Sequence, residues 1–184
     1  MALVYSATGS LDGYVADTDG GFAFAEPDEE LHAFVNDVFG RAGTILSGRR
    51  SYELMDIWDT GDLDTMPEVM AQFACHWRAV DKVVYSRTLE EVTHPRTRLE
   101  RSFEPDAVRA LVRERPDDVM IGGAELGGEA FRAGIVDEVW TFLLPITIGA
   151  GAAMFPTDSS IELDLLEQHR FGSGAVGMRY RVRS

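Results

Sequence analysis

Residues 118–128 read DVMIGGAELGG, a short apolar run that passes through two glycines directly into a helical pattern. This order predicts a strand over residues 118–121 and a helix over about residues 125–133. Glycine lets the backbone approach an anion closely, and a helix start offers unpaired N–H groups and a positive dipole end. The turn therefore suits a pyrophosphate. It lacks the G-x-G-x-x-G fingerprint, however, and a tight turn without a ligand is an equal alternative.

Outward from this turn, strands and helices alternate along the chain. Strands are predicted at residues 3–8, 44–47, 83–86 and 138–144, and helices at residues 27–40, 67–76 and 105–115 and directly after residue 48. Two β segments, residues 161–171 and 175–182, are joined as a hairpin by three small residues. We expect an α/β fold in a single domain over residues 1–184, with a mixed, mostly parallel sheet flanked by helices and an antiparallel C-terminal hairpin.

Composition excludes several classes of function. The 184 residues are 45% hydrophobic and 26% charged, as in an ordinary globular protein, and the net charge of −14 argues against a nucleic-acid partner. Cys75 is the only cysteine and the four histidines lack ligand spacing, so we expect no disulfide and no metal site. No signal peptide or membrane-spanning run is present in the sequence, which predicts a cytoplasmic protein without a membrane partner. The acidic run from Asp56 to Asp64 is expected to be a solvated loop rather than a metal site.

Two further strand ends carry arginine beside hydroxyl groups. Residues 47–51 read SGRRS, and residues 86–88 read SRT. Arginine can grip a phosphate through its planar donor fork, and a serine can cap a helix. Either motif alone is better explained by a surface arginine paired with one of the 31 acidic residues. Three such places at the carboxyl ends of predicted parallel strands favour one shared ligand site, because open α/β sheets bind ligands along that edge.

Several motifs carry a resemblance to a known family. Residues 10–16, SLDGYVA, resemble the Ser-Leu-Asp-Gly segment of the bacterial riboflavin-biosynthesis reductase (RibD C-terminal) domain. Residues 48–53, GRRSYE, resemble the Gly-Arg-x-Thr-x-Glu motif shared with dihydrofolate reductases. Residues 84–89, 134–138, 145–151 and 155–156 continue the similarity in order along nearly the whole chain. The chain is identified as a stand-alone member of this dihydrofolate-reductase-like family.

The resemblance implies that NADPH lies across the carboxyl edge of the sheet. It assigns the phosphates on the adenosine side to the second and third strand ends, the pyrophosphate to the glycine turn, and the nicotinamide cover to the early loop. The implied cofactor-binding residues are Thr8, Ala16, Gly48, Arg49, Arg50, Ser51, Ser86, Arg87, Thr88, Gly122, Gly123, Ala124, Glu125, Leu126 and Gly127. Dihydrofolate reductases place a cis peptide between paired glycines here, so the resemblance also predicts a cis bond between Gly122 and Gly123.

Other residues are candidates for catalysis and for substrate binding. Asp12 lies inside a matched motif and Asp28 at the start of the first long helix, and each is a candidate catalytic carboxylate. The alternatives are a turn organised by Asp12 and an ordinary helix N-terminal acid at Asp28. Tyr14, Phe24 and Trp58 are candidate substrate-binding residues, although aromatic residues more often belong to the core. Tyr14 stands where riboflavin reductases commonly carry lysine, which disfavours a phosphorylated sugar substrate.

We therefore expect an NADPH-dependent reductase that transfers a hydride to a small heterocyclic, carbonyl or imine substrate. A reaction related to 5-amino-6-(5-phosphoribosylamino)uracil reduction is one option. The alternative from another class is an NADP(H)-binding sensor or interaction module without turnover. Dihydrofolate reduction is disfavoured, since Phe22-Ala23-Phe24 replaces the Leu-Pro-Trp segment of the early loop. The apolar run 140–144 predicts a homodimer, unless that strand is buried on both faces within one chain.

Overall fold

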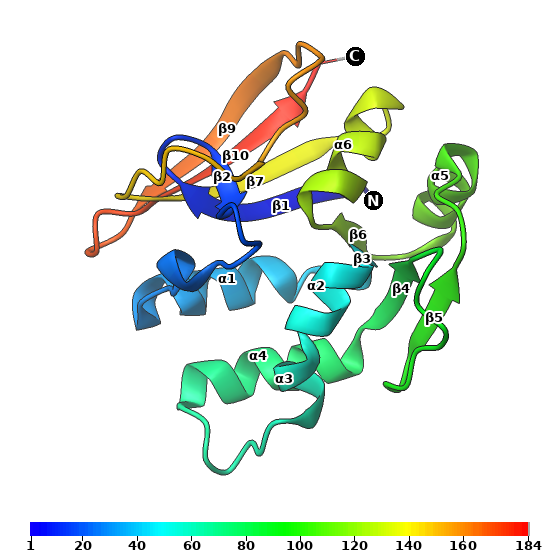
Figure 1. Ribbon diagram of the computed structural model, residues 1–184, viewed down its shortest axis with the longest axis horizontal. Coiled ribbons are helices and arrows are strands. Elements are labelled where there is room, and N and C mark those ends of the chain that lie inside the picture. Colours follow the sequence, from blue (N-terminus) through cyan, green and yellow to red (C-terminus); the bar gives the residue numbers. More distant parts are fainter. Residues whose placement is uncertain (184) are drawn as a thin grey trace.

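The computed structural model describes residues 1–183, and eight of its strands form one sheet in the order β5-β4-β3-β6-β1-β7-β10-β9 (Figure 1). These strands are β1 (Leu3–Ser10), β3 (Ala42–Gly48), β4 (Asp81–Tyr85), β5 (Thr97–Glu100), β6 (Asp118–Ile121), β7 (Glu138–Leu144), β9 (Leu163–Arg170) and β10 (Val176–Val182). Two short strands, β2 (Tyr14–Ala16) and β8 (Ala152–Ala153), pair separately. The helices are η1 (Ala23–Ala25), α1 (Glu29–Phe39), α2 (Arg49–Leu54), α3 (Asp56–Thr60), α4 (Glu68–Ala79), α5 (Pro105–Glu114) and α6 (Ala124–Arg132).

Strand directions confirm the expected sheet. All pairings from β5 across to β7 are parallel, whereas β10 is antiparallel to both β7 and β9. The carboxyl ends of β4, β3, β6, β1 and β7 therefore meet at one edge of the sheet. Because the chain leaves each of these strands at that edge, the loops and helix starts that follow them lie close together there.

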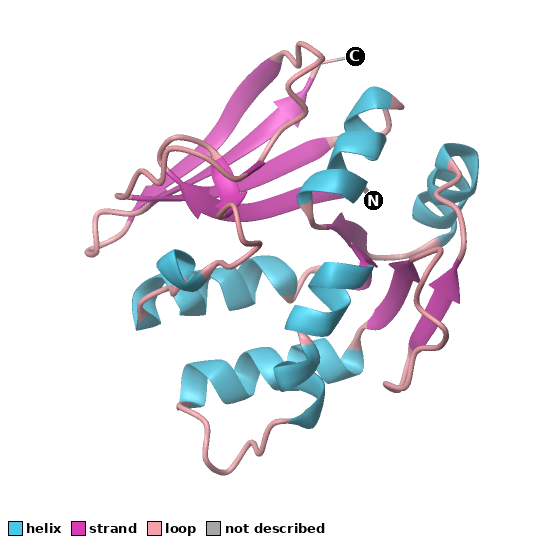
Figure 2. Ribbon diagram, viewed as in Figure 1, coloured by secondary structure: helices cyan, strands magenta, loops and turns pink. Residues whose placement is uncertain are grey.

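Helices cover both faces of the sheet (Figure 2). Successive side chains of a strand point to opposite faces, so Leu3 and Tyr5 of β1 pack under α5 and α6, while Val4 packs with α1 and α4. β7 lies between β1 and β10, and five of its seven residues are buried. Burial on both faces within one chain thus accounts for the apolar sequence of β7 without a second subunit.

The start of α1 is fixed by local chemistry. Asp28 is the N-cap, and its Oδ1 accepts a hydrogen bond from the amide of Leu31 at 2.9 Å. Glu29 and Glu30 follow in the first turn, where acids favour the positive end of the helix dipole. Glu30 also accepts a hydrogen bond from the amide of Gly172 at 2.8 Å, which ties α1 to the β9–β10 hairpin.

Two expectations were wrong. The acidic run is not a solvated loop throughout, because residues 56–60 form α3 and Asp59 is buried against Trp77 and Lys82. The bond between Gly122 and Gly123 is trans, as are all peptide bonds among the described residues. Gly123 turns the chain through its own φ of +90°, a conformation open to glycine, so the turn needs no cis bond.

Candidate functional site

The carboxyl edge of the sheet brings together the three segments that carry arginine or glycine motifs. Ser51, in the first turn of α2, lies against the glycine turn, with its Oγ 3.1 Å from where a Cβ at Gly123 would stand. Arg49, which follows β3, donates a hydrogen bond through Nη1 to Oγ1 of Thr88, in the loop that follows β4, at 3.2 Å. The ends of β3, β4 and β6 therefore contribute to one continuous surface.

The turn between β6 and α6 leaves a small set of amides for a ligand. The Gly122 amide donates to the carbonyl of Leu46 at 3.1 Å, and the Gly127 amide donates to the carbonyl of Gly123 at 2.9 Å. Since the first amides of a helix have no partner within it, those of Ala124, Glu125 and Leu126 remain for a ligand. These amides and the dipole of α6 point at this edge and suit an anion.

The glycines of these motifs differ in their surroundings. A Cβ at Gly48 would meet nothing within 4 Å, and one at Gly122 would meet only the carbonyl of Ser6 at 3.8 Å. Space for a ligand therefore exists beside both. Gly127 differs, because a Cβ there would overlap the ring of Tyr5. Its small size allows α6 to pack closely on β1, where the Tyr5 hydroxyl donates to the carbonyl of Met154 at 2.6 Å.

The arginines on this edge differ in whether an acidic side chain already compensates their charge. Arg49 is half-exposed and its Nε lies 2.6 Å from Oε1 of Glu53, so part of its charge is already compensated. Arg50 and Arg87 are exposed. Ser86 is buried, and its Oγ accepts hydrogen bonds from the amides of Thr88 and Leu89 at 3.2 and 2.9 Å. The Ser86 side chain thus shapes the loop that presents Arg87.

Sequence reasoning missed Arg101, which holds the same loop from outside. Its guanidinium donates to the carbonyls of Ser86, Leu89 and Glu90. Because all three acceptors are main-chain groups, no residue type in the sequence marks them as partners of an arginine. Arg101 is thus a positioning residue for the loop after β4.

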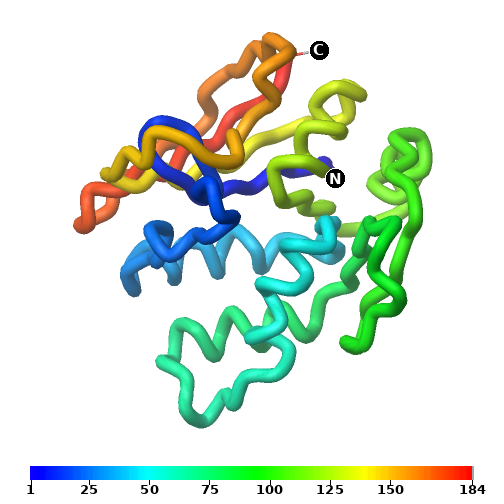
Figure 3. The backbone as a smooth tube through the Cα atoms, in the orientation of Figure 1, coloured from blue at the N-terminus to red at the C-terminus, as the bar shows by residue number. Residues whose placement is uncertain are grey.

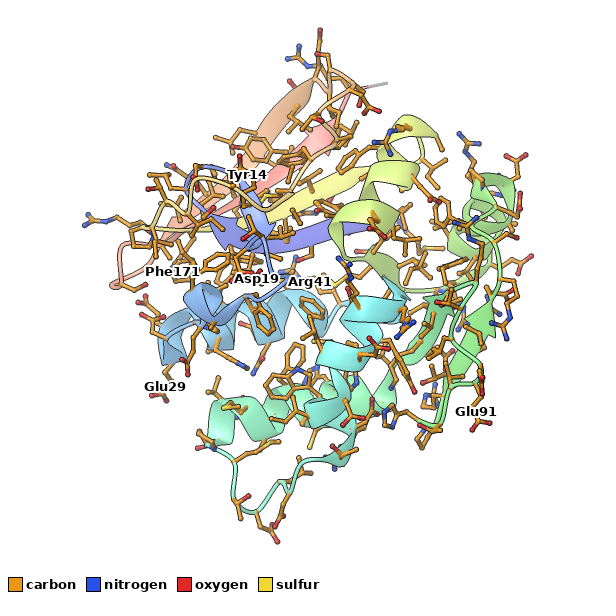
Figure 4. The ribbon with its side chains drawn as sticks, in the orientation of Figure 1. Tyr14, Asp19, Glu29, Arg41, Glu91 and Phe171 are labelled. Carbon is orange, nitrogen blue, oxygen red and sulfur yellow. The ribbon has the colours of Figure 1, made fainter. Side chains whose placement is uncertain are left out.

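The early loop and the loop after β7 are joined by several hydrogen bonds, and Figure 3 shows the two segments side by side. The Asp12 carboxylate accepts hydrogen bonds from the amides of Ile148 and Gly149, at 3.2 and 2.8 Å. β2 and β8 pair next to them (Figure 4, where Tyr14 of β2 is labelled). The Ser10 hydroxyl, followed by the Gly149 and Ile148 amides, holds the pKa of Asp12 below its ordinary value. These hydrogen bonds allow Asp12 to anchor the early loop to the loop after β7.

This anchor leads to a testable expectation. In Asp12→Ala the amides of Ile148 and Gly149 lose their acceptor, so their hydrogen exchange should accelerate several-fold while the sheet remains protected. Peptide-resolved hydrogen–deuterium exchange measures this change. Asp19→Ala, an exposed substitution elsewhere in the early segment, is the control. Unchanged exchange in the loop after β7 would show that Asp12 does not hold it.

A cavity of about 250 Å³ lies beyond the carboxyl end of β7, between the start of α1 and the tail hairpin. It is lined by Phe24, Glu26, Asp28, Leu144, Pro145, Ile146 and Ser173. Of the candidate residues, Phe24 and Asp28 line the cavity. Tyr14 is not among the lining residues, and Trp58 packs edge-on against Phe73, with ring centroids 4.9 Å apart. Glu26 and Ser173 carry no sequence signal, because they lie far apart in the chain.

No helix within residues 1–183 has the length and apolar character needed to cross a membrane. In the same range, no group of three or more His, Cys, Asp or Glu side chains is arranged to hold a metal ion.

Known structures with this architecture include proteins that are named as reductases. A protein from Shewanella sp. PV-4 described as a riboflavin biosynthesis protein aligns over the whole of both chains, with a TM-score of 0.77 and 19% identity. The Thermotoga maritima deaminase/5-amino-6-(5-phosphoribosylamino)uracil reductase aligns with 99% of this chain, with a TM-score of 0.69 and 15% identity, but over only 56% of its own length. Enterococcus faecalis dihydrofolate reductase, complexed with NADP(H), aligns with 100% of this chain and 97% of its own, with a TM-score of 0.67 and 12% identity. The TM-scores show a shared fold, and at these low sequence identities they show the fold alone.

Sequence comparison supplies the family. No curated protein sequence matches the chain. The family model for the RibD C-terminal domain, in contrast, matches residues 2–176, which is almost the entire chain. The chain therefore belongs to the RibD C-terminal domain family and is an oxidoreductase of the dihydrofolate-reductase-like fold.

Proposed function

We propose that the protein is an NADPH-dependent reductase that transfers a hydride to a small heterocyclic, carbonyl or imine substrate. The observation that carries the proposal is that three strand ends with groups able to bind a ligand lie together beside a cavity. Arg49 contacts Thr88, Ser51 lies against Gly123, and the cavity of about 250 Å³ lies at the end of β7 on the same edge. A dinucleotide along this edge would have its phosphates near the arginines and its other end near the cavity.

The residues present fit such a cofactor. The amides of Ala124, Glu125 and Leu126 would hold the pyrophosphate, with Gly122 and Gly123 giving it room. Arg49, Arg87, Ser51 and Thr88 would hold the extra ribose phosphate, with Gly48, Arg50 and Ser86 shaping the surface around them. Residues 8–16 would cover the nicotinamide. NADPH supplies the hydride when bound, and the protein orients it.

On the substrate side, we propose that Asp28 contacts the substrate and that Asp12 positions the cover loop. Asp28 lines the cavity, and Oδ1 of its carboxylate accepts from Leu31. Its other oxygen is left to accept a hydrogen bond from a substrate N–H or to exchange a proton through water. Phe24 and Leu144 supply apolar walls that exclude water from a flat ring.

A titration followed by an activity panel tests the function. We expect one NADPH to bind per chain, and its oxidation to be accelerated by at least one member of a panel of heterocyclic, carbonyl and imine compounds that includes 5-amino-6-(5-phosphoribosylamino)uracil. Binding without oxidation by any compound would instead support an NADP(H)-binding sensor or interaction module. Failure to bind NADPH would overturn the proposal. We further propose the cytoplasm as the compartment of this protein.

We also propose a homodimer, on the evidence of the free edge of the sheet. β9 is the outer strand, and its neighbouring residues Leu165 and Leu166 are 56% and 40% exposed. An edge strand offers unpaired N–H and C=O groups to a second chain, and exposed leucines add apolar area to such a contact. Light scattering at micromolar concentration should give twice the mass of the 20.3 kDa chain, and Leu165→Lys should shift it toward the monomer. A clean monomer mass for the unmodified chain would contradict this proposal.

A further inference from the structure

The basic residues of the chain are unevenly distributed along the sequence. Residues 41–132, which carry Arg49, Arg50 and Arg87, contain 13 of the 17 basic residues. Residues 1–40 contain no lysine or arginine but eight acidic residues, and residues 133–169 again contain no lysine or arginine but six acidic residues. Residues 41–132 also contain 17 of the 31 acidic residues, so the segments differ in where the basic residues lie and not in where the acidic ones lie.

The cavity is built almost wholly from the segments without basic residues. Six of its seven lining residues lie within residues 1–40 or 133–169, and the seventh, Ser173, is uncharged. Two of them, Glu26 and Asp28, are exposed carboxylates. Among the described residues that line the cavity, none is a lysine or arginine.

The arginine nearest in sequence to the hairpin turn, Arg170 at the end of β9, is not among the residues that line the cavity. Arg170 precedes Phe171, whose ring contacts Phe34 of α1 on the cavity face of the sheet, with centroids 5.4 Å apart. His169 stacks on the same Phe34, with centroids 5.0 Å apart. Since side chains alternate along a strand, Arg170 lies on the opposite face from its two neighbours. Figure 4 labels Phe171 near the hairpin and Glu29 at the start of α1, on the same side of the molecule.

The two histidines of these segments do not supply a cation to the cavity. His32 packs edge-on against Trp58 and Phe73, and burial lowers its pKa. His169 stacks on Phe34, and neither histidine is among the residues that line the cavity. The electrostatic character of the cavity is therefore set by Glu26 and Asp28.

Resting on the proposed reductase function, we propose that the substrate of this cavity is an amino-substituted heterocycle, neutral or cationic, that carries no phosphate or other anionic group. Glu26 and Asp28 accept hydrogen bonds from its N–H groups, while Phe24, Leu144 and Ile146 contact its ring faces. A phosphate adds a charge of about −1.5 to −2 at neutral pH and three acceptor oxygens. The cavity walls would meet that charge with two carboxylates and no cation, which disfavours binding.

A matched pair of compounds isolates the phosphate. The pair is 5-amino-6-(5-phosphoribosylamino)uracil and the nucleoside obtained from it with a phosphatase. Both are titrated by calorimetry into the full chain saturated with NADP⁺. We expect the nucleoside to bind roughly tenfold more tightly, because each contact between exposed charges changes affinity by a modest factor and two carboxylates act together. Equal or tighter binding of the phosphorylated compound overturns the proposal, and so does failure of both compounds to bind.

Charge variants show where the preference arises. Glu26→Gln keeps the size of the side chain, and should narrow the difference between the two compounds by roughly twofold to fivefold. Glu29→Gln removes the same charge from α1 outside the cavity lining, and should leave the difference unchanged. If both variants narrow the difference equally, the preference for the nucleoside arises from the net charge of the protein. That result would overturn the proposal that the carboxylates of the cavity cause it. The pair is also titrated into cofactor-free protein. A preference for the nucleoside there, in a protein that does not bind NADPH, would overturn the proposed function but support the charge preference. Binding of NADPH without that preference would overturn the charge preference alone.

Discussion

Asp59→Ala is expected to lower the free energy of unfolding by about 3–5 kcal/mol. Lys82 and Asp59 are only 2% and 5% exposed, and Lys82 Nζ lies 3.5 Å from Asp59 Oδ1. The same ammonium donates to the carbonyl of Trp77 at 2.8 Å, and Asp59 Oδ2 accepts from the Trp77 indole at 2.6 Å. Removing the carboxylate leaves a buried ammonium and a buried indole N–H without their partner. Burial already lowers the pKa of Lys82, which means that burial destabilises its charged form. Loss of the Asp59 carboxylate would destabilise that charged form further.

Urea unfolding followed by fluorescence measures this loss. Asp64→Ala, an exposed acid of the same run, is the matched control and should change stability by no more than about 0.5 kcal/mol. The double variant Asp59→Ala/Lys82→Met should recover part of the stability, because an apolar side chain then replaces the unpaired charge. A loss below about 1 kcal/mol in the single variant would show that water or another group replaces the carboxylate.

The second large effect concerns the choice of cofactor. Under the proposed function, Arg87→Ala and Arg49→Ala should each weaken NADPH binding by roughly tenfold to a hundredfold and scarcely change NADH binding. A hydrogen bond to a charged group contributes about 1.5–3 kcal/mol, and only NADPH carries the ribose phosphate. Arg49 shares its charge with Glu53, so we expect the smaller effect at Arg49 and a gain in NADPH affinity in Glu53→Gln.

Dissociation constants for both cofactors at one fixed salt concentration provide the test, because ionic strength alone changes contacts between exposed charges. Arg113→Ala, which removes an exposed arginine from α5, controls for the change in net charge. If neither Arg49→Ala nor Arg87→Ala narrows the gap between NADPH and NADH, these arginines are surface groups and the ribose phosphate lies elsewhere.

Local pattern was sufficient to predict most of the fold. The strand–turn–helix units at β6–α6 and β3–α2 were predicted because hydrophobic periodicity and glycine position act over a few residues. Asp28 at the start of α1 was recognised as a helix N-terminal acid for the same reason. The edge strand β5 was missed, since its sequence TRLE has no apolar run. The pair β2–β8 was missed because it joins segments more than 130 residues apart.

Contacts between distant segments limited the prediction of the site. Asp59 reads as one acid in a hydrophilic run, and only the packing of α3 against α4 and β4 buries it beside Lys82. Arg101 reads as a surface arginine, and only the fold brings three main-chain carbonyls to it. In both residues the side-chain type gives the charge, whereas the partner depends on tertiary structure.

By itself, the sequence determined the fold class, the family and the strand ends that carry glycine and arginine. These features depend on local order along the chain and on motifs a few residues long. Only the tertiary structure decided that Asp12 joins two loops and that Glu26, Asp28 and Ser173 surround one cavity. It also separated Gly122, with space beside it, from Gly127, which packs on Tyr5. The physical reason is that hydrogen bonds, packing and electrostatic fields depend on distance in space. Segments far apart in the sequence come close to one another only when the sheet assembles.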